Sequence, residues 1–477
     1  MTDETIFDVI IVGAGMAGMV AANRAAELGL KPLVLEKGSE ERYPCNTRWS
    51  GGALHICMQD IEGSPPKLLE AIQKATSGTA SPELAEALVS EAPLTYEWLK
   101  SAGIQFVRVP AITQNHVLSP AKPNMAGQNW QGRGGDVFLR TLDTRLIALG
   151  GRILRGAKAI ELIMERGICV GLSVLIDGKL QELRSRAVVM ADGGYQNDKK
   201  LLQQHISPNP DRVMQRNTKS GTGDGARMAS KVGADIVGMD GGFYGHVLCR
   251  DVFDNEKLWP FPVLDFIAEA GIVVDATGRR FADEGQGGVY LANQIAKLPD
   301  PLSSVLIFDH AIWEGPGRHR AIPPNPFLVL AGGSVYCNST ITGLAEELGL
   351  PIAATAKTIS EYNRAILSDQ VNNMRPFRSV KTFKPHVIQQ GPFYAVRLCA
   401  GITYTLGGIR TDESGRVLRK DASPIKGLFA AGATTGGLEG GEKNGYVGGL
   451  MKSAVFGKRV AEVIANSSGH LQSCEHT

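Results

Sequence analysis

Three glycines near the start of the chain have the spacing of a phosphate-binding turn. Gly13, Gly15 and Gly18 directly follow residues 9–12, an apolar run with the Ile/Val character of a buried parallel strand. Gly13 would permit a sharp turn, Gly15 would let a pyrophosphate approach bare backbone, and Gly18 would let the next helix pack closely on the strand. The N–H groups at that helix N-terminus would face the phosphates, so the spacing predicts a dinucleotide site.

An acidic residue follows where a bound dinucleotide needs one. Residues 31–35 are predicted as a second strand, which ends in Glu36, eighteen residues after Gly18. A carboxylate there can accept hydrogen bonds from both hydroxyls of an adenosine ribose. This stretch fits NAD and FAD equally. The absence of a second clear GxGxxG for a nicotinamide, and the return of the chain to glycine-rich sequence at residues 432–449, favour FAD.

Two polar stretches further along have a composition suited to cofactor contact. Residues 46–52 read NTRWSGG, and a loop so rich in small and hydroxylic residues either links elements or wraps a pyrophosphate. Residues 187–190 are predicted as a strand that runs into Asp192 and Gly193, where a glycine-rich turn would allow close approach of a ligand. We interpret both stretches as cofactor-facing.

The elements expected to position these residues alternate between strands and helices. Apolar spacing predicts helices over residues 82–103, 136–149 and 450–465. Strands are predicted over residues 152–154, 159–163, 170–176, 187–190 and 416–418, and from residue 403 onward.

The alternation is lost in the middle of the chain, where prolines accumulate. This change predicts an inserted second domain over residues 234–385. The predicted fold class is therefore α/β, with a discontinuous Rossmann-like domain over residues 1–233 and 386–477 and an α+β insertion between them.

Length, charge and cysteine content limit the classes of function. A chain of 477 residues exceeds the roughly 250–300 at which single cores stop growing. Fifty basic and forty-eight acidic residues give no sign of a nucleic-acid partner. Seven scattered cysteines predict no metal site or disulfide framework, so redox chemistry would need an organic cofactor and an external electron partner. No apolar run reaches the roughly 18–20 residues of a membrane span, and no signal peptide is recognised, so a cytoplasmic location is expected.

Motifs along nearly the whole chain resemble the flavoprotein family of fumarate reductase and succinate dehydrogenase. They are GAGMAG with LEK, NTRWSGG, VVMADGGY, GTGDGARMASKVGA, GIVVDATGRRFADEG, GITYTLGGIRTDESGRV, and GLFAAGATTGG with GYVGGLMKSAVFGKRVAE. Within the family the likeness is strongest to the tricarballylate dehydrogenases. The resemblance implies FAD held in the split Rossmann-like domain, with the insertion as a capping domain over the flavin. No histidine stands near Asn46 for covalent attachment, so non-covalent FAD is expected.

The resemblance assigns cofactor contacts residue by residue, from the pyrophosphate and ribose to the flavin. These are Gly13, Ala14, Gly15, Gly18, Glu36, Lys37, Asn46, Thr47, Ser50, Gly51, Gly52, Ala159, Asp192, Gly193, Asp224, Gly432, Ala433, Gly448, Gly449 and Leu450. The last three would aim a helix N-terminus at the pyrimidine carbonyl of the flavin, where negative charge accumulates on reduction. Ala433 departs from the family, which usually has an acid there.

Two tyrosines stand where fumarate reductases have other side chains. By motif position the substrate-clamping arginine becomes Tyr446, the histidine before the TMGG turn becomes Tyr404, and the proton-transfer arginine falls near Trp313. Such a tyrosine pair is similar to that of ketosteroid dehydrogenases, where one phenol polarises a carbonyl and another assists proton removal. Tyr404 is also compatible with a packed strand aromatic.

Other candidates for catalysis come from the resemblance or from charge. His246 stands where relatives keep a substrate-contacting histidine, and Glu284 matches the acid of a family proton path; a packed histidine and a salt bridge to Arg279 or Arg280 are the alternatives. Arg133 and residues 318–320 could bind a carboxylate bidentately, although basic runs are usually solvated surface.

The sequence thus predicts an FAD-dependent dehydrogenase or ene-reductase. It would move a hydride and a proton across a Cα–Cβ bond beside a carboxylate or a ketone. Tyr446 and His246 would hold the activating group, and Tyr404 or Glu284 would handle the proton. A polycarboxylate fits the tricarballylate likeness and a cyclic ketone fits the tyrosines. The other hypotheses are a flavin hydroxylase or oxidase that uses O₂, and a redox-inert FAD-binding protein.

Overall fold

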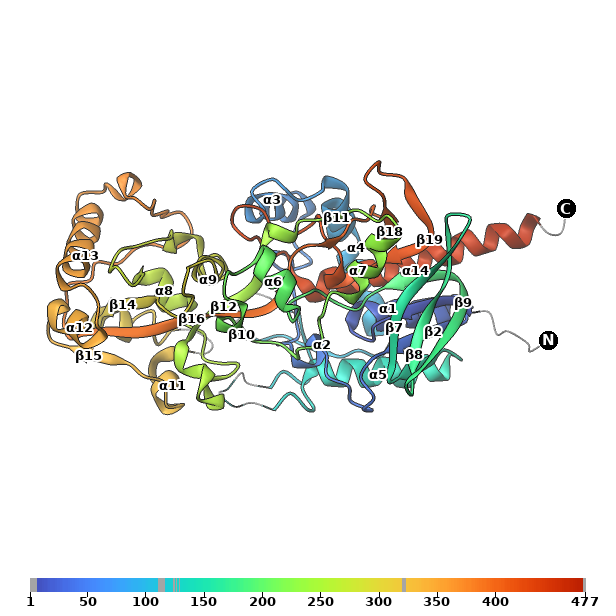
Figure 1. The fold of residues 1–477 in the computed structure, drawn as a ribbon, viewed down its shortest axis with the longest axis horizontal. Helices are drawn as coiled ribbons and strands as arrows, with labels where there is room; N and C mark the ends of the chain where they lie inside the picture. Colours follow the sequence, from blue (N-terminus) through green and yellow to red (C-terminus); the bar gives the residue numbers. More distant parts are fainter. Residues whose placement is uncertain are drawn as a thin grey trace.

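The chain folds into an elongated molecule with a large sheet towards each end (Figure 1). The computed structural model describes residues 7–109, 116–122, 125, 127, 129–319 and 323–474, with side chains as far as residue 467. Both sheets carry helices, so the predicted mixed α/β class is confirmed.

The first sheet has eight strands and contains the predicted glycine-rich turn. Its main path runs β18-β19-β9-β1-β2-β6, and the β7–β8 hairpin joins through β9. The pairs β1–β2, β1–β9, β9–β19 and β2–β6 are parallel, as the buried Ile/Val runs predict. The bounds are β1 (Phe7–Val12), β2 (Pro32–Glu36), β6 (Arg152–Arg155), β7 (Ala157–Glu165), β8 (Ile168–Ile176), β9 (Lys179–Met190), β18 (Arg416–Leu418) and β19 (Pro424–Ala430).

The helices near this sheet contribute to more than one apolar core. The first and last helices pack against each other, which brings the two ends of the chain together beside β1. The bounds are α1 (Met16–Glu27), α2 (Asn46–Trp49), α3 (Pro65–Ala75), α4 (Pro82–Ser101), α5 (Gly134–Ala148), α6 (Lys199–His205), α7 (Asp224–Lys231) and α14 (Gly449–Cys474). Small strands lie beside them: β3 (Ala53–Leu54), β4 (Phe106–Val107), β5 (His116–Leu118), β11 (Ile236–Val237) and β17 (Gly408–Ile409).

The second sheet is built around one long strand, β16 (Phe393–Thr405), which runs from the far end of the molecule to its centre (Figure 1). The other strands are β10 (Met214–Gln215), β12 (Phe243–Cys249), β13 (Ile272–Val274), β14 (Val305–Asp309) and β15 (Tyr336–Asn338). The helices of this part are α8 (Asp265–Ala270), α9 (Gly288–Ala296), α10 (His310–Glu314), α11 (Pro324–Leu330), α12 (Ile341–Leu348) and α13 (Ile352–Leu367).

The second sheet takes strands from both sides of the predicted insertion. β10 precedes residue 234, and β16 begins after residue 385, ten residues before the strand that was predicted from residue 403. The domain division at 234 and 385 stays a prediction. β16 pairs antiparallel with β12, and this register sets Tyr244 opposite Tyr404.

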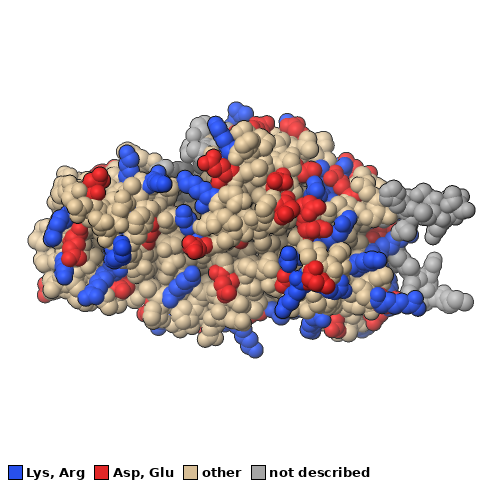
Figure 2. Space-filling model, turned by 90° about the horizontal axis from the view of Figure 1, so that it is seen from above, with Lys and Arg blue, Asp and Glu red and all other residues tan. Residues whose placement is uncertain are grey.

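Charges are spread over the surface without a single dominant sign. Figure 2 shows acidic and basic side chains interspersed over the visible face, in keeping with a formal net charge of +2. Among the described residues, no helix combines the length and the apolar character that crossing a bilayer requires.

Candidate active site

One cavity collects the glycine-rich turn, the polar loops and the start of α14. It encloses about 1230 Å³ of non-protein space, part of it open to solvent. The predicted residues that line it are Gly13, Ala14, Gly15, Glu36, Lys37, Asn46, Thr47, Ser50, Ala159, Asp192, Gly193, Asp224, Ala433, Gly449, Leu450, Tyr404 and Tyr446.

The predicted glycines outside the lining shape the backbone around the cavity. A Cβ on Gly18 would lie 1.9 Å from the carbonyl oxygen of Gly13, so this glycine lets α1 pack on the turn, as its spacing predicts. Gly448 has φ +145°, and a Cβ there would lie 2.2 Å from the carbonyl oxygen of His55. Gly52 and Gly432 also have positive φ, and a Cβ on Gly51 would meet nothing.

The turn between β1 and α1 leaves its backbone open to a ligand. Gly15 precedes α1 and provides no side-chain cap, so the helix N-terminus opens on the cavity. The Met16 N–H donates to Thr47 Oγ1 at 3.0 Å, which ties the polar loop to the helix start. Gly13 has φ +100°, and a Cβ there would lie 2.6 Å from the carbonyl oxygen of Ala191. This is the backbone geometry that a pyrophosphate requires.

Two carboxylates line the cavity, the buried Glu36 and the partly buried Asp192. Glu36 accepts from the N–H groups of Ala14 at 3.1 Å and Gly38 at 2.8 Å, and burial raises the pKa of its carboxyl. Asp192 accepts from the Gly225 N–H at 2.7 Å through Oδ2, while its buried Oδ1 has no hydrogen-bond partner. An acceptor left over in a buried, ligand-sized space fits the hydroxyls of a ribose.

Three tyrosines meet at the other end of the cavity. Tyr446 stacks on Tyr244 with ring centroids 3.7 Å apart, and the Tyr404 ring lies 6.1 Å from Tyr446. All three line the cavity, and burial raises the pKa of each phenol, so each is protonated near neutral pH. The structure therefore brings Tyr404 and Tyr446 together, and adds Tyr244 through the β12–β16 register.

His246 reaches this cluster through Tyr244. Its Nε2 lies 3.2 Å from the Tyr244 hydroxyl, and its Nδ1 lies 2.7 Å from Asp265 Oδ2. A carboxylate on Nδ1 fixes the tautomer and orientation of an imidazole. His246 does not line the cavity itself, so it holds a residue that does.

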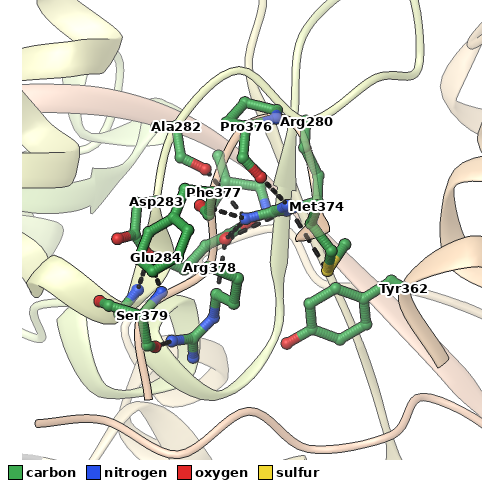
Figure 3. A network of polar contacts seen from close by, with 12 residues as sticks. Arg280, Ala282, Asp283, Glu284, Tyr362, Met374, Pro376, Phe377, Arg378 and Ser379 are labelled. Carbon is green, nitrogen blue, oxygen red and sulfur yellow. Dashed lines mark hydrogen bonds and ion pairs between the residues drawn. The ribbon is translucent and has the colours of Figure 1, made fainter. Parts of the chain in front are cut away.

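Glu284 lies in a different environment. Its side chain is 0% exposed, is absent from the cavity lining, and accepts from Arg280 Nε at 2.9 Å and from the Val273 N–H at 3.2 Å. Figure 3 shows Arg280 and Arg378 converging on it. The geometry is that of the salt bridge to Arg280, the alternative considered above. A buried, fully paired carboxylate is poorly placed to exchange protons at the cavity.

Arg216 lies close to Tyr244, and Arg133 lies close to Arg216. Arg133 is 4% exposed, and burial together with the charge of Arg216 lowers its pKa. Arg216 donates to Thr403 Oγ1 at 3.3 Å and to the Pro260 carbonyl at 3.1 Å, and its guanidinium lies 4.8 Å from the Phe261 ring centroid. Thr403 lines the cavity. By contrast, Arg318 is exposed and pairs with Glu314, and Arg320 lies outside the described residues.

The sequence did not indicate Glu439 and Lys452 beside Tyr404, or His55 beside Tyr446. Glu439 accepts hydrogen bonds from the Tyr404 hydroxyl at 2.9 and 3.0 Å and from Lys452 Nζ at 2.5 Å. His55 lies edge-on to Tyr446 at 5.2 Å, and burial lowers its pKa to about 4, so it is neutral. Glu439 lies in a glycine-dense run that reads as a turn, so no periodicity indicates it.

The donors of the cavity fit an FAD along its length. The open helix start and Thr47 would hold the pyrophosphate, Glu36 and the unpartnered Asp192 Oδ1 the adenosine, and the start of α14 the flavin. Ala433 lines the cavity although it lacks the acid usual in the family.

Comparisons with known proteins agree with this fit. The family described as FAD binding domain matches residues 8–445. The chain is 25% identical to NADH:fumarate oxidoreductase of Klebsiella pneumoniae (strain 342), over 92% of this chain but only 45% of that protein. It is also 25% identical to 3-oxosteroid 1-dehydrogenase of Mycolicibacterium smegmatis (strain ATCC 700084 / mc(2)155), over 96% of this chain and 97% of that one.

A solved structure has the same fold over its whole length. It is a 3-ketosteroid-delta4-(5alpha)-dehydrogenase from Rhodococcus jostii RHA1 in complex with 4-androstene-3,17-dione, with a TM-score of 0.73 and 23% identity over 98% of both chains. The open helix start, the two cavity-lining acids Glu36 and Asp192, and the family match lead to one conclusion: this chain belongs to the FAD binding domain family and is an FAD-dependent oxidoreductase.

Proposed function

We propose that this enzyme exchanges a hydride and a proton across a Cα–Cβ bond that lies beside a carboxylate. The observation that carries the proposal is a partly buried cation, Arg216, next to the cluster of tyrosines at one end of the cavity. The flavin supplies the hydride chemistry when bound. The chain itself must then hold the carboxylate and move the proton.

The surroundings of Arg216 favour an anionic substrate over a neutral one. Among the residues that the structure describes, no carboxylate comes within 4.0 Å of its guanidinium. The nearby acid Asp265 is already held by His246 Nδ1 and by the Val247 N–H at 2.9 Å. Burial lowers the pKa of Arg216, and a bound carboxylate would offset that cost. Arg133 is close enough to Arg216 for the two charges to interact, and a pair of cations at this end is in keeping with a polycarboxylate of the tricarballylate type.

We give the tyrosines roles at the substrate atoms whose charge changes in the reaction, the carboxyl oxygens and the carbon that loses a proton. Removing a proton beside a carboxyl group builds negative charge on its oxygens, and a protonated phenol can donate to them. We assign this role to Tyr446, with Tyr244 stacked on it and oriented by His246. Tyr404 is assigned to the proton. We also propose that residues 234–385 cap this end of the cavity, since β12 carries Tyr244.

A neutral ketone is the second candidate. The phenols of Tyr446 and Tyr404 favour it, because a hydrogen bond from a phenol can polarise a ketone without a cation.

One assay separates the two candidates. Purified protein is mixed anaerobically with an artificial electron acceptor, or with reduced donor dye, and with saturated or unsaturated carboxylic acids, their primary amides and cyclic ketones. We expect turnover with acids and not with their amides. Turnover with ketones and amides alone would contradict the carboxylate assignment. In a parallel reaction with O₂ present, flavin re-oxidation together with substrate hydroxylation would favour the hydroxylase hypothesis.

Replacing Glu36 with glutamine is expected to raise the Kd for FAD about tenfold, or ~1.4 kcal/mol. The amide retains one acceptor but loses the charge that strengthens hydrogen bonds from ribose hydroxyls. The measurement is a fluorescence titration of the apo protein with FAD, and the exposed Glu40→Gln is the matched control. An unchanged Kd in Glu36→Gln would remove Glu36 from the cofactor contacts.

A further inference from the structure

A buried acid, a buried base and a cavity-lining phenol form one hydrogen-bonded cluster at the start of α14. Glu439 is 5% exposed and Lys452 is 1% exposed. The Tyr404 hydroxyl donates to both oxygens of Glu439, at 2.9 and 3.0 Å, and Lys452 Nζ donates to Oε2 at 2.5 Å. The Val447 N–H also donates to Oε1, at 3.0 Å. Of the three side chains, only Tyr404 lines the cavity.

We propose that Glu439 is the proton acceptor and donor of the reaction and that Tyr404 relays the proton between Glu439 and the substrate. The inference rests on the proposed function and adds to it the residue that stores the proton. Glu439 does not touch the substrate. It acts through Tyr404, whose hydroxyl it also positions by accepting its hydrogen bond. Lys452 holds the Glu439 carboxyl group in place through their ion pair.

The relay follows from the direction of the hydrogen bonds. The Tyr404 hydroxyl already donates its hydrogen to Glu439, so its oxygen has lone pairs left for a proton from the cavity side. When a substrate C–H bond breaks, its proton goes to the Tyr404 oxygen as the Tyr404 O–H proton passes to Glu439. The hydride of the neighbouring carbon, with its electron pair, would be taken up by the flavin, which supplies the hydride chemistry when bound. Atoms and charge balance, and the reverse sequence serves a reduction.

Tyr404 alone could not do this. Burial and the charge of Glu439 hold the pKa of its phenol well above the usual value, so a free phenolate is not available near neutral pH. Passing its own proton to Glu439 in the same step removes the need for that phenolate. Glu439, whose carboxylate oxygens lie 2.9 and 3.0 Å from the Tyr404 hydroxyl, is thus the base, and Tyr404 connects it to the cavity.

A purely structural ion pair would give a different experimental result. Breaking a buried pair by removing one partner costs about 3–5 kcal/mol, whereas replacing both partners with neutral side chains is often neutral or stabilising. If Glu439 only neutralises Lys452, the double variant Glu439→Gln/Lys452→Met should therefore recover. If Glu439 carries the proton, the double variant folds and binds FAD but stays slow.

The test compares wild type, Glu439→Gln, the double variant and the exposed control Glu442→Gln in a single-turnover reaction with a carboxylate substrate. We expect the single-turnover rate constant to fall about 10²-fold in the single and double variants. The FAD content of the double variant and the rate constant of Glu442→Gln should be unchanged. A double variant within threefold of wild type would overturn the relay.

An infrared difference spectrum supplies a reading that does not depend on rate. In the direction that takes hydrogen from the substrate, the wild type should gain a protonated-carboxyl band that both Glu439 variants lack. The same band in Glu439→Gln would overturn the proposal. If the wild type turns over no acid or ketone, the proposed function fails and the relay falls with it; an active wild type matched by the double variant removes the relay alone.

Discussion

Replacing Arg216 with glutamine is expected to lower kcat/KM for a carboxylate substrate about 10³-fold, or ~4 kcal/mol. The guanidinium donates to Thr403 and lies near Tyr244, and these two residues line the cavity. It has no acidic partner within 4.0 Å among the described residues, so the substrate would be its counter-ion. Glutamine keeps a hydrogen-bond donor for Thr403 but removes the charge. The measurement is steady-state turnover of an acid with an artificial acceptor.

The specificity of that loss is what tests the assignment. Arg216→Lys should recover part of the activity, because an ammonium keeps the charge but not the planar fork of donors. Arg318→Gln, an exposed arginine paired with Glu314, is the matched control and should behave as wild type. Equal losses for acids and for neutral ketones in Arg216→Gln would mean that Arg216 supports the fold rather than a carboxylate.

Replacing Tyr446 with phenylalanine is expected to lower kcat by 10²–10³-fold and to change KM little. Phenylalanine keeps the ring stacked on Tyr244 at 3.7 Å and edge-on to His55, so the packing survives while the hydroxyl donor is lost. A donor that acts mainly on charge formed in the transition state affects kcat rather than KM. Rapid-mixing kinetics of the flavin absorbance would measure the hydride step directly.

The control for this variant is a tyrosine remote from the cavity. Tyr336, at the edge of the second sheet, can be changed to phenylalanine and should leave the kinetics unchanged. If Tyr446→Phe keeps the wild-type rate with every acid and ketone, the phenol is not a donor in the reaction. A flavin spectrum that no small molecule perturbs, in both proteins, would instead favour the redox-inert hypothesis.

The cofactor half of the site could be predicted because its signal is local. The strand, the glycines and Glu36 lie within thirty residues, and Gly13 and Gly18 are each required by a close approach of neighbouring backbone. The parallel strands of the first sheet are buried on both faces, so their apolar runs are easy to read. The closing helix was placed at residues 450–465 but continues to Cys474, because its polar last turns carry no apolar signal.

The substrate half was harder because it depends on contacts between distant parts of the chain. β16 begins ten residues before the predicted strand, and only its register with β12 sets Tyr244 against Tyr404. Arg216 reaches the same place through β10, which pairs with β16. Glu439 lies among glycines, where no periodicity distinguishes a functional acid from a turn residue. No local pattern in the sequence predicts these contacts between distant residues.

The central claim is that this flavoprotein exchanges hydrogen with a carbon–carbon bond beside a carboxylate. Anaerobic titration of the FAD-loaded protein with matched saturated and unsaturated acids and their amides tests it most directly, with the flavin absorbance as the signal. We expect an acid to reduce the oxidised flavin, or its unsaturated partner to re-oxidise the reduced flavin, and the amides to do neither. A flavin that no acid or ketone reduces or re-oxidises would contradict the claim.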